Sequence, residues 1–523
     1  MKNNIKYLAV LALGLVACEP EFDNPIDEAG VFTSGEADFS NYVALGNSLT
    51  AGFADNALYI TGQENSYPNI LAGQFELAGG GEFTQPLMAD NAGGALLGGT
   101  QILNNRLVLA FDANGENPGP AIYTGATPTT EISNNLGNSF NNMGVPGAKS
   151  YHLAAPGYGN VAGVSAGLAN PYFARFASSA DATVIGDAVA QNPTFFSLWI
   201  GNNDILGYAT SGGVGVDHNE TGNIDPATYG GNDITNNNVF ASVYNDLLAA
   251  LTANGAKGVV LNLPDVTSLP FFTTVPNNAL VLDASTAASL TGFFQAVTGI
   301  VTAQLAGAGV PLAQAQQIAA QYLIQFNEGP NLFLIETEVT ATNPLGIRQM
   351  TPDELLLLTI DRTALAQGYG SVVLTPEVLQ VLGILQAGGT PTAEQGLLVI
   401  NAISGIEDGD ALDSTELMAI SNARSSFNAT IKALADANDL AFYDVARDLV
   451  QAANGGIPFD GGVITSDFVT GGGFSLDGVH PTPRAHALVT NGIIDAIKQT
   501  YGAALPSVNP GDFGTVTLSN DVN

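Results

Sequence analysis

The chain has 523 residues, enough for one large domain or two to three ordinary ones, and 46% of them are hydrophobic. This apolar content excludes global disorder. The 48 acidic and 13 basic residues give a formal net charge of −35, which argues against nucleic acid as a partner and against electrostatic adsorption to anionic lipid. A single cysteine excludes an intramolecular disulfide and a cysteine-based metal site.

Residues 1–17 have the pattern of a secretory signal peptide. A basic start precedes an apolar run over residues 7–16, which is too short for an ordinary transmembrane helix. The following Leu-Val-Ala-Cys resembles a bacterial lipobox and predicts that Cys18 becomes the acylated first residue of the mature chain. An ordinary signal peptide with an incidental cysteine is the alternative. Residues 18–38 begin with an acidic, proline-containing stretch and predict a tether, so we expect an outer-membrane lipoprotein on the periplasmic or cell-surface side.

Four apolar segments predict buried strands, and the segments that precede two of them predict helices. The strands are expected at residues 39–46, 195–200, 258–263 and 440–445, and the helices at 239–253 and 414–438. Apolar strands that alternate with helices favour a parallel sheet covered on both faces, so the predicted fold class is α/β. The domain is expected to span residues 39–505, with a polar tail at 506–523. Ligands of such sheets bind beyond the carboxyl ends of the strands.

Two long segments interrupt this alternation. Residues 73–135 are rich in Gly and Asn and predict loops with short strands. Residues 275–412 predict a mainly helical insertion, with further helical segments at 353–358 and 376–385. Residues 284–327 contain no charged side chain and predict either a pair of packed helices or an apolar cap over a catalytic cleft. Polar residues interrupt every twenty-residue window there, which disfavours a membrane span.

Four short blocks supply the side chains that a serine hydrolase needs. They are GNSLTAG at 46–52, NMGVPG at 142–147, GNND at 201–204 and DGVH at 477–480. Ser48 follows a predicted strand and begins a predicted helix, whose N-terminus favours negative charge. Because an unactivated hydroxyl is a poor nucleophile, Ser48 needs a base within hydrogen-bond reach.

Among the four histidines, His480 is the best candidate for that base. Asp477 precedes it by three residues and can orient the Nδ1–H group, which leaves Nε2 to face Ser48. His218 lies in a polar loop, and His486 lies on a helix after the DGVH block. Both are expected to be surface residues rather than catalytic ones.

An acyl-transfer site also needs hydrogen-bond donors directed at the developing oxyanion. Asn203 offers a side-chain amide at the end of a predicted strand. Gly147 offers a backbone N–H that no side chain blocks, and the N–H of Ser48 is a third donor. Taken alone, Gly147 is equally compatible with a simple turn and Asn203 with a strand-end cap.

The order and composition of these blocks resemble those of the SGNH (GDSL-type) hydrolase superfamily. The resemblance covers residues 38–55, 138–150, 190–265 and 413–500. It implies that Ser48 is the nucleophile, His480 the general base and acid, and Asp477 its orienting partner. It also implies that Gly147 and Asn203 donate to the oxyanion. The fold that it implies is a three-layer α/β/α flavodoxin-like core, with no metal and no organic cofactor.

The chain departs from the superfamily pattern in two places. Asn47 stands where the GDSL string usually has Asp. Since that Asp is not the nucleophile, the change is expected to tune activity rather than abolish it. The insertion at 275–412 has no counterpart in compact members, so the resemblance leaves the substrate open.

Two further patterns are weaker. Ser165 lies in a G-x-S-x-G match of the α/β-hydrolase type, but no apolar strand precedes it and the surrounding glycines predict a loop, so we exclude it as the nucleophile. Two acidic loops offer oxygen ligands for calcium without the EF-hand spacing, and no metal site is expected. Their residues are Asp217, Asp225 and Asp233 in one loop, and Asp408, Asp410 and Asp413 in the other.

The sequence therefore predicts a serine esterase or lipase that hydrolyses carboxylic esters through an acyl-enzyme. Its expected partners are an ester substrate, either an acylated lipid or an acylated glycan, and the membrane through the anchor on Cys18. A carbohydrate O-acetyl esterase is one alternative. A non-catalytic surface binding lipoprotein is another, although all the chemical groups of the site are intact.

Overall fold

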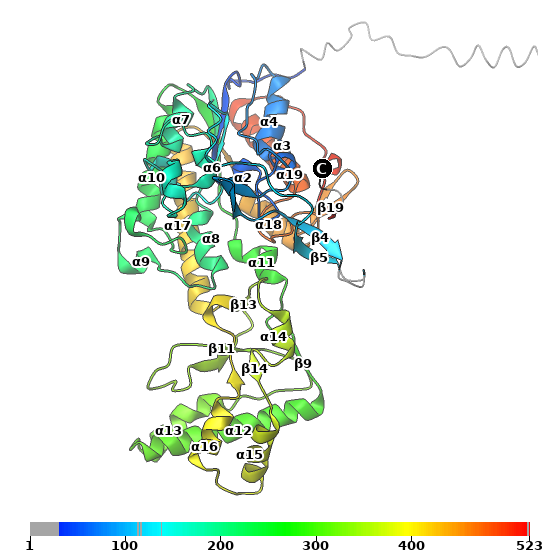
Figure 1. The fold of residues 1–523 in the computed structure, drawn as a ribbon. Helices are drawn as coiled ribbons and strands as arrows, with labels where there is room; N and C mark the ends of the chain where they lie inside the picture. Colours follow the sequence, from blue (N-terminus) through cyan, green and yellow to red (C-terminus); the bar gives the residue numbers. More distant parts are fainter. Residues whose placement is uncertain (1–30, 112–114, 116–117, 138, 520–521, 523) are drawn as a thin grey trace, which may run out of the picture.

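A computed structural model describes residues 31–523 apart from 112–114, 116–117, 138, 520–521 and 523. The predicted signal peptide and Cys18 lie outside the described residues. Figure 1 shows a main body built around a sheet and, at one end of it, a separate body formed by the insertion at 275–412. We call the latter the insertion body.

A five-stranded parallel sheet forms the centre of the main body. Its strands are β1 (Tyr42–Gly46), β6 (Asn142–Gly144), β7 (Phe195–Trp199), β8 (Lys257–Leu261) and β17 (Ala441–Tyr443). They lie in the order β17-β8-β7-β1-β6, and every neighbouring pair is parallel. The strand order reverses between β1 and β7, and such a reversal is where open α/β sheets bind ligands.

The four predicted strands are confirmed, and the fifth strand, β6, was not predicted. Asn142–Gly144 is only three residues long and contains a polar residue and a glycine, so it has no apolar pattern to detect. It pairs with β1 at the edge of the sheet, with Ala44 opposite Asn142 and Gly46 opposite Gly144. The glycine block is therefore an edge strand followed by a turn.

Helices cover both faces of the sheet. On one face lie α7 (Val184–Val189), α10 (Asn237–Thr252) and α17 (Ser414–Ala437), and on the other lie α4 (Tyr67–Glu76) and α19 (Pro483–Tyr501). Phe240 of α10 stacks on Phe427 of α17 with ring centroids 4.0 Å apart. The α/β fold class is confirmed, as are the helices predicted at 239–253 and 414–438.

The segment at 73–135 forms short strand pairs, as expected. Its hairpins are β2 (Ala95–Leu97) with β3 (Thr100–Leu103), and β4 (Leu107–Phe111) with β5 (Pro118–Ile122). The β4–β5 hairpin lies on the same side of the main body as α19 in Figure 1.

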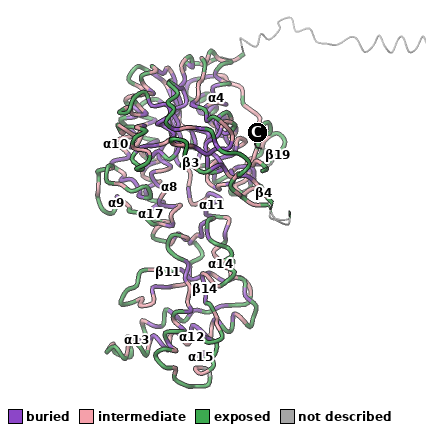
Figure 2. Tube along the Cα trace, viewed as in Figure 1, coloured by how far each residue is buried: buried purple, intermediate pink, exposed green. Residues whose placement is uncertain are grey.

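The insertion body has its own apolar core. Its main helices are α12 (Ala284–Gly307), α13 (Leu312–Ala319), α15 (Pro376–Gln386) and α16 (Ala393–Ile400). Side chains such as Phe293, Phe294 and Val399 form a buried cluster distinct from that of the sheet. Figure 2 shows this smaller buried region below the larger one.

The pair of helices predicted in 284–327 is thus present, but it does not cap a catalytic cleft. α12 and α13 lie at the far end of the molecule from the sheet, because their apolar faces are satisfied by the local core. Among the described residues, α12 is the one helix long and apolar enough to cross a membrane, a property shared by core helices of soluble proteins.

The predicted helical segment at 353–358 is wrong. Leu355–Leu356 form strand β13, which pairs with β16 (Ala411–Leu412) where the insertion leaves and rejoins the main body. Pairing between residues distant in the chain overrides the local preference of a leucine run for helix.

Both ends of the described chain pack on the main body. The N–H of Thr33 donates to the carbonyl of Ala504 at 3.0 Å, so residues 33–38 belong to the domain rather than to the tether. The expected polar tail also packs back, since the N–H of Leu109 in β4 donates to the carbonyl of Thr517 at 2.9 Å.

Candidate active site

Ser48, His480 and Asp477 form a chain of hydrogen bonds at the carboxyl end of β1. His480 Nε2 lies 2.9 Å from Ser48 Oγ, and His480 Nδ1 lies 2.9 Å from Asp477 Oδ2. These are the distances expected of a nucleophile, a base and the group that orients the base. The structure therefore brings together three of the predicted site residues from opposite ends of the chain.

The GNS sequence explains why Ser48 stands where it does. Ser48 is the first residue of the short helix α2 (Ser48–Ala51), and Asn47 caps it by accepting the N–H of Leu49 at 3.0 Å. Gly46 must be glycine, because a Cβ there would lie 2.5 Å from the carbonyl oxygen of Trp199 in the neighbouring strand. Asn47 therefore performs a capping role that Asp also performs well.

The surroundings of Asp477 stabilise an ionised carboxylate. Asp477 accepts the N–H groups of Asn56, Val479 and His480 at 2.8 to 2.9 Å. Burial favours a higher pKa, but the charge of His480 and these hydrogen bonds outweigh it and lower the pKa of Asp477 to about 2. An ionised Asp477 holds the proton of His480 on Nδ1 and leaves Nε2 free to accept from Ser48.

The DGVH block makes this pairing within one turn of chain. Gly478 has a φ of +72°, and a Cβ at this position would lie 3.1 Å from the backbone nitrogen of Phe271. The turn folds the chain so that Asp477 can bond both the backbone N–H and the ring of His480. The contact between Asp477 and His480, three residues apart, is therefore a local property of the sequence.

The two predicted oxyanion donors lie beside each other. Asn203 is the first residue of α8 (Asn203–Thr210), directly after β7, and its side chain lines the same cavity as Ser48. Gly147 lies in the turn after β6 with a φ of +80°. The Asn203 amide donates one N–H to the carbonyl of Ala148 at 2.9 Å, which joins the asparagine block to the glycine block.

The buried ion pair of Asp55 and Arg106, which the sequence did not predict, supports the loop that carries Asp477. Asp55 and Asn56 both have positive φ, and the N–H of Asn56 donates to Asp477. Asp55 accepts the N–H of Leu476 at 3.0 Å and pairs with Arg106 at 2.6 Å. This strained dipeptide therefore fixes the loop that carries Asp477 at two successive residues.

Arg106 is buried and makes several contacts through its guanidinium, although its Nε has no hydrogen-bond partner among the described residues. Its guanidinium lies 3.6 Å from the centroid of the Tyr59 ring, and the Tyr59 hydroxyl donates to Asp55 at 2.8 Å. Arg106 also donates to Thr517 near the C-terminus at 2.8 Å, and the residue is only 2% exposed. Its one sequence signal is that it is the single basic residue in the segment 73–135.

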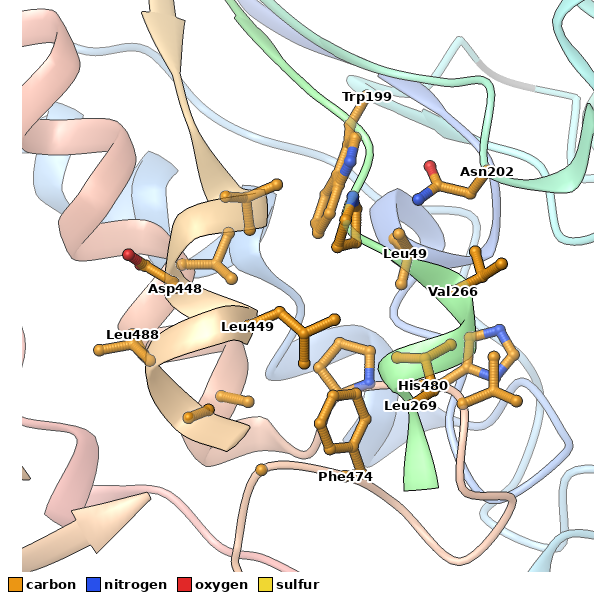
Figure 3. Close-up of a pocket in the computed structure, with 18 of the residues that line it drawn as sticks. Leu49, Trp199, Asn202, Val266, Leu269, Asp448, Leu449, Phe474, His480 and Leu488 are labelled. Carbon is orange, nitrogen blue, oxygen red and sulfur yellow. The ribbon is translucent and has the colours of Figure 1, made fainter. Parts of the chain in front are cut away.

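An apolar cavity opens beside Ser48 (Figure 3). Its empty space, open mouth included, is about 860 Å³. One part of its wall comes from α18 (Val445–Ala453) and from the hairpin of β18 (Ile457–Phe459) and β19 (Gly462–Ile464). The sequence analysis missed this wall, although apolar Val445, Leu449 and Ala452 recur at helical spacing.

A second, wider groove borders His480 on the side of Asp477. It is lined by the β5 prolines and by Phe271, Leu358 and Arg362, whereas Ser48 and Asn203 line the apolar cavity. Leu358 and Arg362 belong to the insertion. The part of the insertion that reaches the site is therefore this short segment, and not the pair of helices that was expected to cover it.

The expectation that His218 and His486 are surface residues is wrong. His218 is buried, with Nε2 2.8 Å from Asp233 and its ring stacked on Tyr229. His486 is 2% exposed, and its Nδ1 accepts the N–H of Tyr67 at 3.3 Å. The polar loop folds back on itself around His218, and His486 lies on the inner face of α19.

Ser165 and the acidic loops hold no comparable arrangement. Ser165 is exposed at the end of the short helix α5 (Val161–Val164), consistent with its exclusion. Asp217 and Asp413 each cap a helix, and Asp233 bonds His218. Among the described residues, no group of three or more His, Cys, Asp or Glu side chains is placed to hold a metal ion.

The arrangement joins an activated hydroxyl, a base with a fixed tautomer and an amide donor at one mouth of an apolar cavity. These are the groups that acyl transfer to and from a serine requires. Comparison of the chain with known protein families, with curated proteins and with solved structures finds no match.

Proposed function

We propose that the chain is a serine hydrolase that cleaves carboxylic esters through a covalent acyl-enzyme. The observation that carries the proposal is the hydrogen-bonded chain of Ser48, His480 and Asp477, with both His480 contacts at 2.9 Å. The buried His218 also bonds a carboxylate and a hydroxyl, so what distinguishes His480 is the open cavity beside its serine partner. A histidine held between an ionised carboxylate and a serine hydroxyl next to an open cavity is set up for proton transfer.

The reaction begins when Ser48 Oγ attacks the ester carbonyl carbon and His480 Nε2 takes the hydroxyl proton. The N–H groups of Ser48 and Gly147 and the side chain of Asn203 stabilise the negative oxygen of the tetrahedral intermediate. Collapse breaks the bond to the alcohol, which leaves with the proton from His480. Water then attacks the acyl-serine with His480 again as the base, and the carboxylic acid departs as Ser48 is restored.

The strand order supports the flavodoxin-like fold that the resemblance implies. Numbered along the chain, the five strands lie in the order 2-1-3-4-5, which is the order of flavodoxin-like sheets. Together with the four sequence blocks, this order supports membership of the SGNH (GDSL-type) superfamily with a three-layer α/β/α core. The lipobox-like sequence supports a lipoprotein that is anchored to the outer membrane through Cys18.

A carbohydrate O-acetyl esterase is the second candidate, because a groove wider than the apolar cavity borders His480 on the side of Asp477. A bulky glycan alcohol would occupy that groove. The same nucleophile and base would serve it. A binding lipoprotein without activity is disfavoured, since it would have no need for the Ser48–His480 hydrogen bond.

The test is a fluorophosphonate probe applied to the purified full chain, with the modified peptide identified by mass spectrometry. Modification of Ser48 is expected, together with hydrolysis of p-nitrophenyl esters. Ser48→Ala should lose labelling and at least about 10⁴-fold in kcat. Ser165→Ala is the matched control and should behave as the wild type. Labelling of another serine, or equal turnover by Ser48→Ala, would reject the proposal.

A further inference from the structure

Most of the polar residues that line the cavity beside Ser48 gather at one end of it. Ser48, His480, Asn202 and Asn203 lie among its lining residues, and Figure 3 shows His480 and Asn202 on the side opposite Leu488. The other lining side chains are almost all aliphatic or aromatic, and Figure 3 shows Leu49, Val266 and Leu269 on the side of His480 as well. The aliphatic and aromatic side chains include Leu49, Trp199, Leu206, Val266, Leu269, Leu449, Ala452, Ile457, Ile464, Phe474, Leu488 and Val489.

The few polar atoms near the apolar part are directed elsewhere. The Trp199 indole N–H donates to the carbonyl of Asn262 at 3.1 Å, so its ring alone faces the cavity. In Figure 3 the Asp448 carboxylate points away from the cavity, and it accepts the hydroxyl of Tyr443. A ligand in the apolar part would therefore meet a hydrocarbon surface with no hydrogen-bonding demand.

The position of the cavity relative to the reacting atoms fixes which half of an ester it receives. The carbonyl carbon must sit at Ser48 with its oxygen toward Asn203, and both residues line the cavity. The alcohol oxygen must sit at His480 Nε2, since that atom donates the proton on departure. His480 lines both spaces, whereas Ser48 and Asn203 line the cavity alone and Asp477 lines the second groove alone. The acyl group thus extends into the cavity and the alcohol into the groove.

We propose that this cavity is an acyl-chain site, so that the substrate is an ester of a medium- or long-chain fatty acid rather than of acetate. The inference rests on the proposed ester hydrolysis. Each methylene moved from water into such a surface raises kcat/KM by about fourfold until the cavity is full. An acetyl group would occupy only the polar end. The residues that set chain length are then those of α18 and the β18–β19 hairpin.

The test is a series of p-nitrophenyl esters from acetate to palmitate with three variants of the full chain. Ala452→Phe fills the cavity from α18, where Ala452 is 7% exposed. Val450→Phe is the matched control on the same helix, where Val450 is 56% exposed. Ile457→Trp fills the cavity from the hairpin and replaces Ala452→Phe if that variant fails to fold, as judged by fluorophosphonate labelling.

The wild type is expected to prefer octanoate over acetate by at least about tenfold. Ala452→Phe or Ile457→Trp should abolish that preference, whereas Val450→Phe should match the wild type. A wild type that labels at Ser48 but shows no chain-length preference would overturn the acyl-site inference alone. So would cavity-filling variants with an unchanged preference. A wild type that neither labels nor hydrolyses any ester would reject the proposed function itself.

Discussion

At the residue scale, the position of Asp477 depends on a charge pair that does not touch the reacting atoms. Asp55 holds the N–H of Leu476, and Arg106 balances the charge of Asp55. Both side chains of the pair are 3% exposed. Removing one partner of a buried ion pair leaves an uncompensated charge, which costs more than the pair contributes.

Arg106→Met is therefore expected to lower the free energy of unfolding by about 3–5 kcal/mol. The double variant with Asp55→Asn should recover part of that loss, because no unpaired charge remains buried. Urea unfolding of the wild type, both single variants and the double variant measures the coupling. Equal stability of Arg106→Met and the double variant would contradict the role assigned to the pair.

At the scale of elements, the inner face of α19 carries an ionisable side chain into the core. His486 accepts the N–H of Tyr67 through Nδ1, and its Nε2 finds no hydrogen-bond partner among the described residues. Burial, together with the nearby charge of His480, lowers the pKa of His486 to about 3. The helix therefore packs with a neutral imidazole, whereas the unfolded chain binds a proton below about pH 6.5.

This difference makes stability fall as the pH falls from about 6.5 towards 3, because the unfolded chain binds the proton first. Between pH 7.5 and pH 5 the contribution is about 2 kcal/mol. His486→Asn keeps an acceptor for the Tyr67 N–H and cannot be protonated, so its unfolding free energy should decline less over this range by that amount. Urea titrations of both proteins at the two pH values measure it. Equal declines would show that His486 is not the group responsible.

Elements were predictable from the sequence where their signal is local. β1, β7, β8 and β17 are mainly apolar, α10 and α17 are long, and DGVH places Asp477 against His480 within four residues. β6 is too short for a pattern. The Asp55–Leu476 bond joins residues 421 apart in the chain, and the cavity wall faces Ser48 only after α18 has packed. Such contacts depend on the tertiary fold and leave no periodic signal.

At the scale of the whole molecule, the sheet and the helices of the insertion body have separate apolar cores, and a smaller third cluster around Phe333 and Leu356 also lies in the insertion. The cluster around Phe293 lies in the insertion body, and the cluster around Phe427 lies between α10, α17 and the sheet. The bodies meet at a narrow region near α11 (Pro270–Thr273) and β13. Local stability can therefore differ between them.

Phe293→Ala is expected to cost about 3–5 kcal/mol within the insertion body. Hydrogen exchange should then lose protection in α12, α13, α15 and α16, while the sheet strands and the hydrolysis of short esters remain as in the wild type. Phe427→Ala is the matched control, and it should reduce protection in the sheet and lower turnover. Loss of protection throughout the chain in Phe293→Ala would show instead that the two bodies unfold as one unit.

The part of the cavity wall formed by α18 and its hairpin follows β17, which is an edge strand with a single neighbour, whereas Ser48 and Asn203 follow the central strands β1 and β7. Insertions or substitutions in α18 and its hairpin therefore reshape the cavity without moving the strands that hold the nucleophile and the amide donor. The proposed chemistry and the proposed chain-length preference can therefore change independently during evolution. A lineage can change the fatty acid that it accepts by drift at the sheet edge while its hydrolytic centre stays under purifying selection.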